Sequence, residues 1–551
     1  MNSAVRRLSA AIAAGTLVVT LAACAESERG AGGGEGGTMV FGAPGAPAMF
    51  DPVYATDGET FRVSRQMFET LVTYAPGTAD LAPGLATEWT PNDDGTQWTF
   101  ALQEGVTFHD GTPFDAEAVC FNFDRWANLP NEAAQSQAEY YVGLFGGFAQ
   151  NAGDYGESIY AGCEAPDANT AVLNLTEGTG ALPAAFGLTS LSISSPTALQ
   201  EYDADGIELS GEAFTYPAYA MEHPTGTGPF RFESYDRASG TVTLARNDDY
   251  WGETAGLDQL IFRVIPDENA RRQELQAGTI QGYDLPSPGD WAALRDAGFQ
   301  VLEREPFNIF YLGINQANNP ALADVRVRQA IAHAVDRESL AQNQLPDSAE
   351  VATQFIPETV EGYASDLEPI PYDPDRARAL LAEAGASDLT VNFYYPTEVT
   401  RPYMPNPTNL FTTIAENLRQ VGITVNPVAQ PWNGGYLDSV NVAGTHDLHL
   451  LGWTGDYNDA GNFVGTFFGR AKPEFGFTNQ ELFDELAAAD RTVDPAEKAA
   501  AYEQANRSIM EYLPSVPLTT SPPAVVVAEN VEGMVPSPLT DERFSTVTIA
   551  D

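Results

Sequence analysis

The sequence predicts an α/β protein, and three observations support this fold class. The chain has 551 residues, which is room for three or four modules of about 150 residues each. Hydrophobic residues make up 43% and aromatic residues 11% of the chain, which is ample for packed cores. Strand-like and helix-like segments also alternate from about Phe307 onward. Alternation of this kind favours a largely parallel sheet with covering helices.

The first half of the chain contains strand and helix patterns of its own. Residues 96–109 have the pattern of two strands joined by a turn at Glu104-Gly105. Asp115 is expected to begin a helix, and a further strand is expected over residues 170–175. Four residues of the helix fall near one face: Val119, Cys120, Phe123 and Trp126.

In the second half, strands and helices take turns. Asp324 is expected to cap one helix, and a second helix, with Phe411 and Leu418 on its apolar face, is expected to end at Gly422. Strands are expected at residues 310–315, 391–395, 423–425 and 448–451.

Two charged residues follow strands of this region. Arg401 comes after the strand at 391–395, and Asp456 comes after the strand at 448–451. Ligands of open α/β sheets bind outside the carboxyl ends of strands, so both residues are candidates for one binding site. Asp456 lies in the stretch LGWTGDYNDAGNF. Its carboxylate is a catalyst, a metal ligand or the counter-charge for an amine.

Acidic residues outnumber basic ones by a wide margin. The chain contains 76 aspartates and glutamates against 27 lysines and arginines, which gives a formal charge of −49 at pH 7. A nucleic-acid partner is not expected, because binding to phosphates needs a basic face. We attribute the acidity to solubility or to a salty environment, since net charge concerns solubility rather than fold.

The N-terminal residues predict export and lipid attachment. An apolar run over residues 10–21 is too short to span a bilayer as a stable anchor. It ends in Leu21-Ala22-Ala23-Cys24, which resembles the lipobox of bacterial lipoproteins, where the cysteine is lipidated and becomes the first mature residue. We expect a signal peptide over 1–23, a flexible tether over 24–37, and a protein lipid-anchored at the extracytoplasmic face of the bacterial membrane. The alternative is an ordinary secretory signal with a chance cysteine.

The two remaining cysteines predict a disulfide. With Cys24 assigned to the lipid, Cys120 and Cys163 have one possible pairing, and an exported protein meets an oxidising environment. Closing a loop of about 43 residues stabilises a fold by up to roughly 4 kcal/mol in the chain-entropy model. Two cysteines without clustered histidines do not predict a zinc site.

Five stretches in a fixed order carry a family resemblance. They are LAPGLATEW (81–89), WTFALQEGVTFHDGTPFDAEAVCFNFDR (98–125), PTGTGPF (224–230), RNDDYWG (246–252) and DVRVRQAIAHAVDR (324–337). Together they resemble the family 5 solute-binding proteins, the peptide and nickel class that serves ATP-driven importers. The resemblance spans about Met39 to Asp551. It implies a two-lobed α/β periplasmic-binding-protein fold of type II that binds a solute without any cofactor.

Two further motifs narrow the resemblance. RPYMPNP (401–407) and GWTGD (452–456) resemble those of the dipeptide-binding subgroup. In that subgroup the arginine of the first motif clamps the ligand carboxylate, and the aspartate of the second motif takes the ligand amine. The resemblance therefore implies these roles for Arg401 and Asp456. The chemistry fits, because a guanidinium grips a carboxylate with two hydrogen bonds and a carboxylate pairs with an ammonium.

Residues near these motifs are expected to line the ligand cavity, although hydrophobic core is the alternative for the aromatic ones. Residues 56–58 match the loop of the first lobe that meets the peptide backbone in relatives. The chain departs from the subgroup at Ala460, where proline is usual, and by one extra residue between Trp432 and Tyr436. The predicted ligand-binding set is Asp57, Gly58, Arg401, Tyr403, Trp432, Trp453, Thr454, Gly455 and Asp456.

The resemblance also implies the domain organisation and the partners. Lobe I is expected over residues 38–305, with an inserted subdomain at about 76–220, and lobe II over residues 306–514. Residues 515–551 are expected to return to lobe I. A peptide bound between the lobes would favour a closed form, which would dock on the membrane permease of an ABC importer. A monomer is expected.

Catalysis and metal binding are the alternatives. The chain has no Gly-x-Ser-x-Gly, His-Glu-x-x-His or Gly-Lys-Ser motif, so an enzyme such as a secreted hydrolase is not expected. His446 and His449 are expected on opposite faces of a strand, which argues against a shared metal. A calcium loop is not expected, because Ala460 and Phe467 stand where ligands would lie. Another solute of the same family, such as a nickel chelate, heme or an oligosaccharide, is the alternative to peptides.

Overall fold

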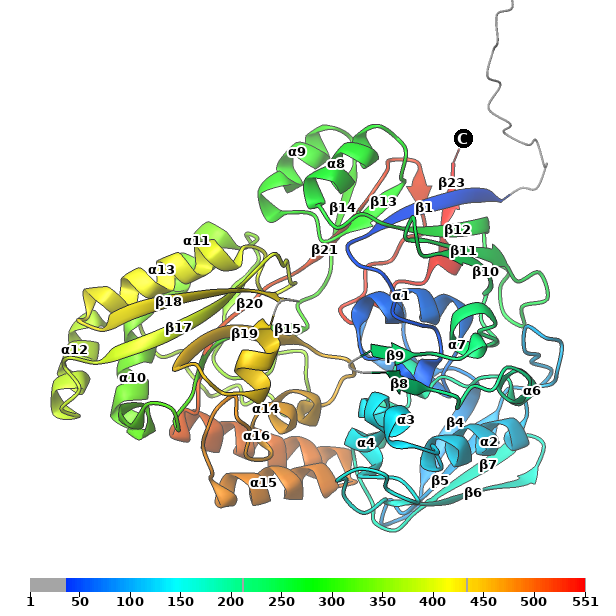
Figure 1. Cartoon of the computed structure of the whole chain (residues 1–551), viewed down its shortest axis with the longest axis horizontal. Coiled ribbons are helices and arrows are strands. Elements are labelled where there is room, and N and C mark those ends of the chain that lie inside the picture. Colours follow the sequence, from blue (N-terminus) through cyan, green and yellow to red (C-terminus); the bar gives the residue numbers. More distant parts are fainter. Residues whose placement is uncertain (1–35, 211–212, 433–434, 551) are drawn as a thin grey trace, which may run out of the picture. The chain divides into compact units, whose positions relative to one another are not determined.

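The computed structural model describes residues 36–210, 213–432 and 435–550. The predicted signal peptide, Cys24 and nearly all of the predicted tether lie outside the described residues. Two large β-sheets organise the described chain, and a four-stranded sheet is the largest of the others there (Figure 1).

The first large sheet has seven strands in the order β10-β11-β12-β1-β13-β21-β14. Its strand β1 sends Met39 and Phe41 into one hydrophobic core and Val40 toward another, because successive side chains of a strand point to opposite faces. Both faces of the sheet are therefore covered. The strands are β1 (Gly37–Ala43), β10 (Phe230–Asp236), β11 (Thr241–Arg246), β12 (Leu257–Val264), β13 (Gly282–Asp284), β14 (Gln300–Glu303) and β21 (Ala524–Val527).

The second large sheet has six strands in the order β16-β20-β15-β19-β17-β18. Strand β17 is parallel to β18 and β19, whereas β15 and β20 run antiparallel to their neighbours. The prediction of a largely parallel sheet is therefore wrong. A helical crossover permits parallel pairing of β17 with β18, but β15 enters directly from the first sheet without such a crossover. The strands are β15 (Asn308–Ile314), β16 (Glu350–Val351), β17 (Thr390–Thr397), β18 (Thr424–Pro431), β19 (Leu448–Thr454) and β20 (Val516–Thr520).

Helices cover both faces of the second sheet. All seven residues of β15 are buried, with Phe310, Leu312 and Ile314 in one core and Ile309 and Tyr311 in another. Continuous burial of this kind is typical of a strand covered on both faces. The first core is completed by α10 (Val325–Ala334), α11 (Arg337–Gln344), α12 (Pro374–Glu383) and α13 (Pro407–Gln420), and the second by α15 (Gln480–Arg491) and α16 (Pro495–Tyr512) (Figure 1).

The four-stranded sheet has the order β4-β5-β7-β6, and helix α2 (Ala116–Ala127) contacts β6 and β7. The Asp115 carboxylate caps α2, as predicted, by accepting a hydrogen bond of 2.9 Å from the Ala118 N–H. Cys120 and Cys163 form a disulfide that joins α2 to β6, which confirms the predicted pairing. The strands are β4 (Ala86–Pro91), β5 (Gln97–Leu102), β6 (Tyr160–Asp167) and β7 (Thr170–Leu175).

Two further local predictions, a strand and a helix cap, are confirmed, and one predicted strand is wrong. The strand predicted over 170–175 is confirmed as β7, and Asp324 caps α10 as predicted. The second strand predicted within 96–109 does not form, and Thr107 makes only an isolated bridge. The chain reverses direction at Gly111, whose φ of 82° favours glycine. The segment between the turn at Glu104-Gly105 and this reversal is therefore too short to form a strand.

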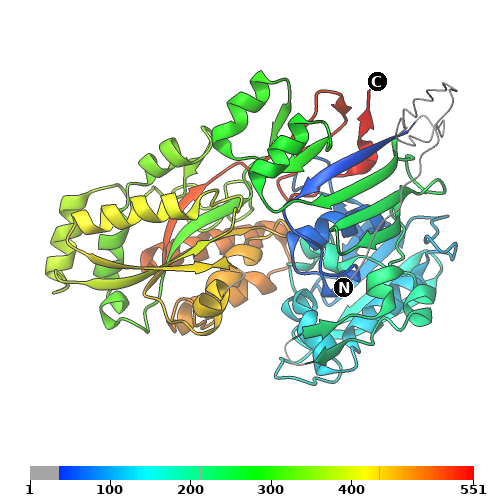
Figure 2. The same cartoon turned by 45° about the horizontal axis from the view of Figure 1, so that its top comes forward.

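The remaining elements connect these sheets. The other helices are α1 (Gly58–Met67), α3 (Glu132–Gln137), α4 (Glu139–Phe145), α5 (Leu182–Ala185), α6 (Pro196–Glu201), α7 (Ala218–Glu222), α8 (Glu268–Gln276), α9 (Trp291–Asp296) and α14 (Thr466–Phe468). The short strands are β2 (Val72–Tyr74), β3 (Leu81–Pro83), β8 (Glu208–Ser210), β9 (Ala213–Thr215), β22 (Val531–Glu532) and β23 (Thr548–Ile549). Strand β23 lies beside β1 (Figure 2).

The chain passes twice between the two large sheets. The first passage follows β14 and the second precedes β21. The passages lie side by side, because the Asn308 side-chain amide donates to the Ser521 carbonyl at 2.7 Å and the Ser521 N–H donates back at 3.2 Å. The lobe boundaries at 305/306 and 514/515 stay predictions. Strand β20 pairs within the second sheet, which places the second passage a few residues beyond 514.

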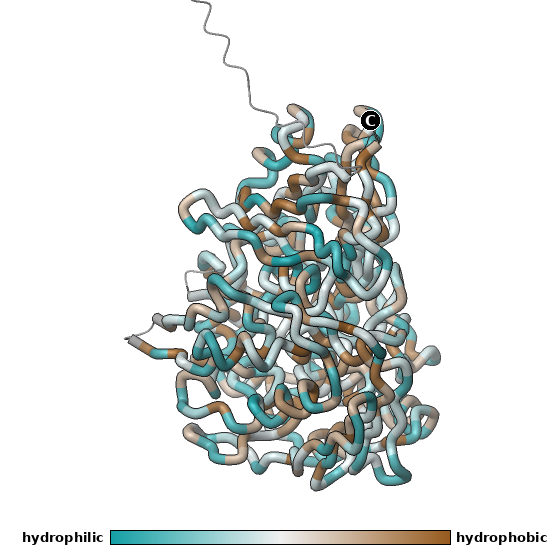
Figure 3. Tube along the Cα trace, turned by 90° about the vertical axis from the view of Figure 1, so that its right-hand side faces the viewer, coloured by the Kyte–Doolittle hydropathy of each residue, from teal (hydrophilic) through white to brown (hydrophobic). Residues whose placement is uncertain are grey.

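Hydrophobic residues occur in short stretches along the described chain (Figure 3). This distribution suits strands and helices that bury one or two faces. Among the helices of the described residues, none is long and apolar enough to cross a membrane.

Candidate ligand-binding site

A cavity of about 410 Å³, here called the ligand cavity, lies between helix α1 and the loops that follow β17 and β19. Strands β17 and β19 are parallel neighbours, so their carboxyl ends meet at one edge of the sheet, as expected for Arg401 and Asp456. All nine predicted ligand-binding residues line this cavity: Asp57, Gly58, Arg401, Tyr403, Trp432, Trp453, Thr454, Gly455 and Asp456. The role of each stays a prediction.

Arg401 begins a tight turn after β17. The main chains of Arg401 and Met404 exchange hydrogen bonds of 3.2 and 3.0 Å. The Arg401 guanidinium carbon lies 4.4 Å from the centre of the Trp432 ring, which is a cation–π contact that orients the charge. Arg401 forms no ion pair with any carboxylate in the part of the chain that the structure describes. Its charge is therefore available to a ligand.

Asp456 faces the same cavity with little compensation. Its N–H donates to the Asn462 side chain at 2.9 Å, while its Oδ2 atom is buried and has no hydrogen-bond partner among the described residues. Burial raises the pKa of the Asp456 carboxyl to about 6. The Tyr140 hydroxyl, the Arg65 charge and the Asn462 side chain lower this pKa, but burial has the larger effect. A carboxyl in this state gains from an approaching cation.

Glycines let aromatic side chains close the wall between the two motifs. Tyr403 is buried and stacks over Phe310, with ring centres 6.4 Å apart. A Cβ on Gly452 would lie 2.4 Å from the Tyr403 ring, and one on Gly455 would lie 2.2 Å from the Phe307 ring. Both positions therefore need glycine for close packing. The Trp453 indole N–H donates to the Asn462 side chain at 3.2 Å. This hydrogen bond fixes the orientation of the Trp453 ring in the cavity wall.

Asp57 already has a structural task. Its carboxylate accepts hydrogen bonds of 3.0 Å from the N–H groups of Glu59 and Thr60, which caps α1. It also accepts a hydrogen bond of 2.6 Å from the Thr60 hydroxyl. A direct bond from Asp57 to a ligand would compete with this cap. Gly58 has nothing within 4 Å of a Cβ position, so open space adjoins it.

Sequence reasoning missed several residues that line the cavity, among them Arg62 and Asp284. Arg62 forms an ion pair with Asp284, which also pairs with Arg304 at 2.7 Å. Arg304 in turn pairs with Glu542 at 2.6 Å. All four side chains are buried, and they come from four distant parts of the sequence. No local spacing could have revealed this network, which connects the cavity to the passage between the sheets.

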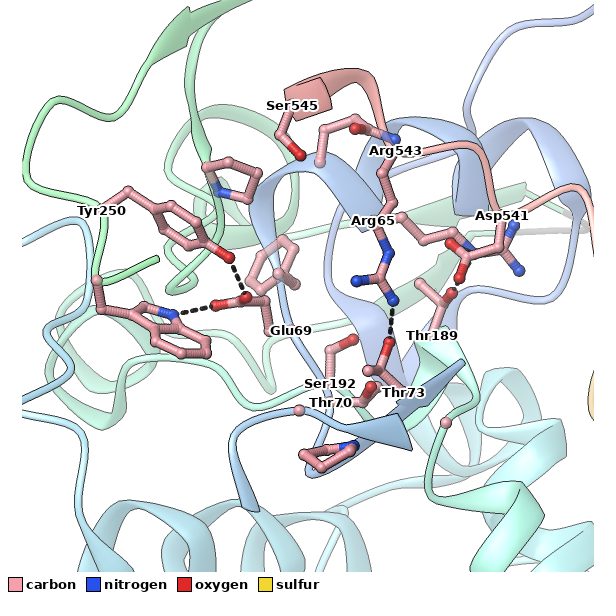
Figure 4. A pocket seen from close by; sticks show the side chains of 17 residues that line it. Arg65, Glu69, Thr70, Thr73, Thr189, Ser192, Tyr250, Asp541, Arg543 and Ser545 are labelled. Carbon is pink, nitrogen blue, oxygen red and sulfur yellow. Dashed lines mark hydrogen bonds and ion pairs between the residues drawn. The ribbon is translucent and has the colours of Figure 1, made fainter. Parts of the chain in front are cut away.

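A smaller cavity of about 140 Å³ shares Arg65 with the ligand cavity. Figure 4 shows Arg65 among the residues that line the smaller cavity. Glu69 accepts hydrogen bonds from the Tyr250 hydroxyl at 2.7 Å and the Trp251 indole N–H at 2.8 Å (Figure 4). Burial raises the pKa of Glu69, and these donors hold it down. Arg543 donates to a main-chain carbonyl of β2 at 2.9 Å. Because Glu69 and Arg543 already have hydrogen-bond partners within the protein, we regard this cavity as a polar part of the core.

The prediction for His446 and His449 is wrong. Their rings lie 4.4 Å apart, because β19 begins only at Leu448 and the alternation of a strand does not apply to His446. His449 lies 3.2 Å from the Glu474 carboxylate, to which the Tyr311 hydroxyl donates at 2.7 Å. Burial raises the pKa of the Glu474 carboxyl, but its polar contacts, that with His449 foremost, together outweigh burial and lower this pKa to about 2. Within residues 36–210, 213–432 and 435–550, no His, Cys, Asp and Glu group is arranged to hold a metal.

Comparison with known proteins places the chain in a family. Residues 80–474 match the bacterial extracellular solute-binding proteins, family 5. The chain is 30% identical to the dipeptide-binding protein of Escherichia coli over 528 residues, which is 93% of this chain and 94% of that protein. It is 29% identical to heme-binding protein A of Haemophilus influenzae over 558 residues, which is 98% of each.

A solved structure agrees with these relatives. The ABC transporter-associated periplasmic binding protein of Helicobacter pylori, in complex with the peptide STSA, aligns with a TM-score of 0.75 and 26% identity. The alignment covers 94% of this chain and 98% of that one. The predicted two-lobed α/β fold is confirmed, and the relatives are binding proteins rather than enzymes. The chain belongs to the family 5 bacterial extracellular solute-binding proteins, which serve ABC importers.

Proposed function

We propose that the protein captures dipeptides or short oligopeptides between its two lobes and delivers them to the permease of an ABC importer. The observation that supports this best is a pair of opposite charges in one cavity. Arg401 and Asp456 both line the ligand cavity, and neither pairs with another ion in the described chain. A free peptide carries an ammonium at one end and a carboxylate at the other, so it supplies a partner for each.

The known relatives support the same class of ligand. The Escherichia coli relative is a dipeptide-binding protein, and the Helicobacter pylori structure holds a peptide. The Haemophilus influenzae relative binds heme, so family membership alone does not select peptides. The charge pair favours a peptide over heme in this proposal, because a heme offers no ammonium to Asp456.

The energetic consequence is large when the cavity closes around a ligand. Removing one partner of a buried ion pair costs about 3–5 kcal/mol, because the other charge stays buried and unpaired. At about 1.4 kcal/mol per tenfold change, this is roughly a hundred- to several-thousand-fold in affinity. Both ends of the peptide therefore contribute to recognition.

Calorimetric titration of capped peptides tests the proposal. Asp456→Asn keeps the shape of the side chain but removes its charge, so it should weaken Ala-Ala far more than acetyl-Ala-Ala. Arg401→Gln should act in the opposite sense and spare Ala-Ala-amide. The wild-type protein should bind Ala-Ala more tightly than either capped form.

The alternative is that Asp456 only caps its own loop. In that case Asp456→Asn would lose stability, and free and acetylated peptides would lose affinity alike. Equal losses of affinity for the two peptides would contradict the proposed pairing of Asp456 with the peptide ammonium. Asp57→Asn is a matched control, because Asp57 lines the same cavity but its charge serves helix α1. It should not discriminate between free and acetylated peptide.

Lipid attachment at Cys24 is part of the proposed function. The lipobox-like stretch at 21–24 supports a protein tethered by lipid to the outer face of the cell membrane. The thirteen residues of the tether that follow Cys24, residues 25–37, would reach roughly 20 Å as a flexible chain. This is enough to hold the binding protein beside its permease without orienting it.

A further inference from the structure

A larger cavity of about 970 Å³, here called the side cavity, adjoins the ligand cavity. Its walls come from α3, α4 and the loop after them on one side, and from residues 457–472 with α15 and α16 on the other. Thr56, Tyr140 and Trp453 line both cavities. These three side chains are therefore the partition between the two spaces.

Tyr140 is the part of the partition that lies at Asp456. Its hydroxyl lies near the Asp456 carboxyl, and its ring packs on Phe61 with centres 6.0 Å apart. The helix that carries it, α4, packs against α2, because the ring centres of Phe145 and Phe123 lie 6.2 Å apart. Tyr140 thus stands at the place where a bound peptide would put its ammonium.

The side cavity has the charge that suits an ammonium. Three acidic residues line it, Glu139, Asp154 and Asp490. The two basic residues are Arg470 and Lys472, and Lys472 is occupied by the Glu474 carboxylate at 3.4 Å and by a main-chain carbonyl at 3.1 Å. A peptide amino terminus that passed Tyr140 would therefore meet three carboxylates, and Arg470 would be the one lining cation without a carboxylate partner among the described residues.

We propose, resting on the proposed peptide function, that Tyr140 limits ligand length at the amino end and that the side cavity accepts amino-terminal extensions once its ring is removed. The ligand would not extend into the side cavity from its carboxyl end, because Arg401 would bind the carboxylate there. Tyr140 is then a specificity-determining residue, because it decides between dipeptides and longer peptides with the same carboxyl end.

The test compares Ala-Ala, Ala-Ala-Ala and acetyl-Ala-Ala by calorimetric titration. Wild-type protein should prefer Ala-Ala to each extended ligand by at least about tenfold. Tyr140→Ala should reduce both preferences by about tenfold or more, because the extension gains the side cavity. Tyr140→Phe keeps the ring and should keep the wild-type length preference. Tyr140→Val, which removes the ring while leaving a β-branched side chain, should act like Tyr140→Ala and serves if that variant folds poorly.

Two controls identify the cause. Tyr155→Ala removes an aromatic ring that lines only the side cavity, so the length preference should not change. Ala-Ala-amide, which is altered only at the carboxyl end, should gain nothing from Tyr140→Ala. Equal weakening of short and long peptides in Tyr140→Ala, or a wild type that binds both lengths equally, would overturn the inference alone. A wild type that binds none of these peptides would overturn the proposed function with it.

Discussion

Asp456 is the residue at which recognition and stability oppose each other. Its pKa is 3.8 in the unfolded chain and about 6 in the folded one, a difference worth about 3 kcal/mol. Because the folded pKa is raised, the ionised carboxylate destabilises the fold. This destabilisation is absent below about pH 4, where both states are protonated, and complete above about pH 6.

Asp456→Asn should therefore stabilise the empty protein by up to about 3 kcal/mol at pH 7.5 and by almost nothing at pH 3.5. Denaturant unfolding of both proteins at the two pH values measures this difference. Asp57→Ala provides the contrast, because it removes the cap of α1 and should destabilise by about 1 kcal/mol. A less stable Asp456→Asn at pH 7.5 would show that the carboxylate is a loop cap instead.

The same pKa sets the pH dependence of binding. An ammonium pairs with the ionised carboxylate, so binding must first remove the proton of Asp456. With a pKa of about 6 in the empty protein, Ala-Ala should bind about tenfold more weakly at pH 5 than at pH 7. Titration across this range should give a flat profile for Asp456→Asn. A wild-type profile that is equally flat would contradict the assignment.

Residues were predictable from the sequence only where a motif carried them. Arg401 and Asp456 each belong to a recognisable stretch that follows a strand, and the parallel pairing of β17 and β19 brings them to one edge. Tyr140 belongs to no such stretch. It enters the cavity from the short helix α4, and only the folded arrangement of distant segments reveals its position.

At the scale of elements, the disulfide between Cys120 and Cys163 is the clearest local constraint. It joins α2 to β6 across a sequence separation of 43 residues. Replacing both cysteines by alanine should lower the free energy of unfolding by up to roughly 4 kcal/mol. Denaturant unfolding of the variant, and of wild type with and without reductant, measures the loss. A double variant as stable as the oxidised wild type would contradict the expectation.

Local signals predicted elements well, and long-range pairing was beyond them. Helix starts at Asp115 and Asp324 were predictable, because a carboxylate caps the N–H groups of its own helix. The direction of β15 was not, because its partners β19 and β20 lie far along the chain. The pattern of alternating strands and helices suggested parallel pairing, but a strand that crosses directly from another sheet does not obey that rule.

At the scale of the whole molecule, location depends on one residue in the proposed account. Cys24→Ala should release the protein from the membrane fraction into soluble extracytoplasmic material, because no lipid could then be attached. Detergent partitioning of wild type and variant measures this. The double variant of Cys120 and Cys163 is the matched control and should stay with the membrane. Unchanged retention of Cys24→Ala would contradict the lipid assignment.

The position of β21 has a consequence for how the molecule is made. Strands β13 and β14 do not pair with each other; each pairs with β21, which lies between them. Every strand of the second sheet precedes β21 in the chain. During synthesis the second sheet can therefore complete itself while the first still has an open slot between two of its strands. Such a slot exposes unpaired backbone N–H and C=O groups. The slot is closed only when nearly the whole chain has emerged. A truncation between β20 and β21, after residue 520 and before residue 524, would therefore leave the first sheet divided while sparing every strand of the second.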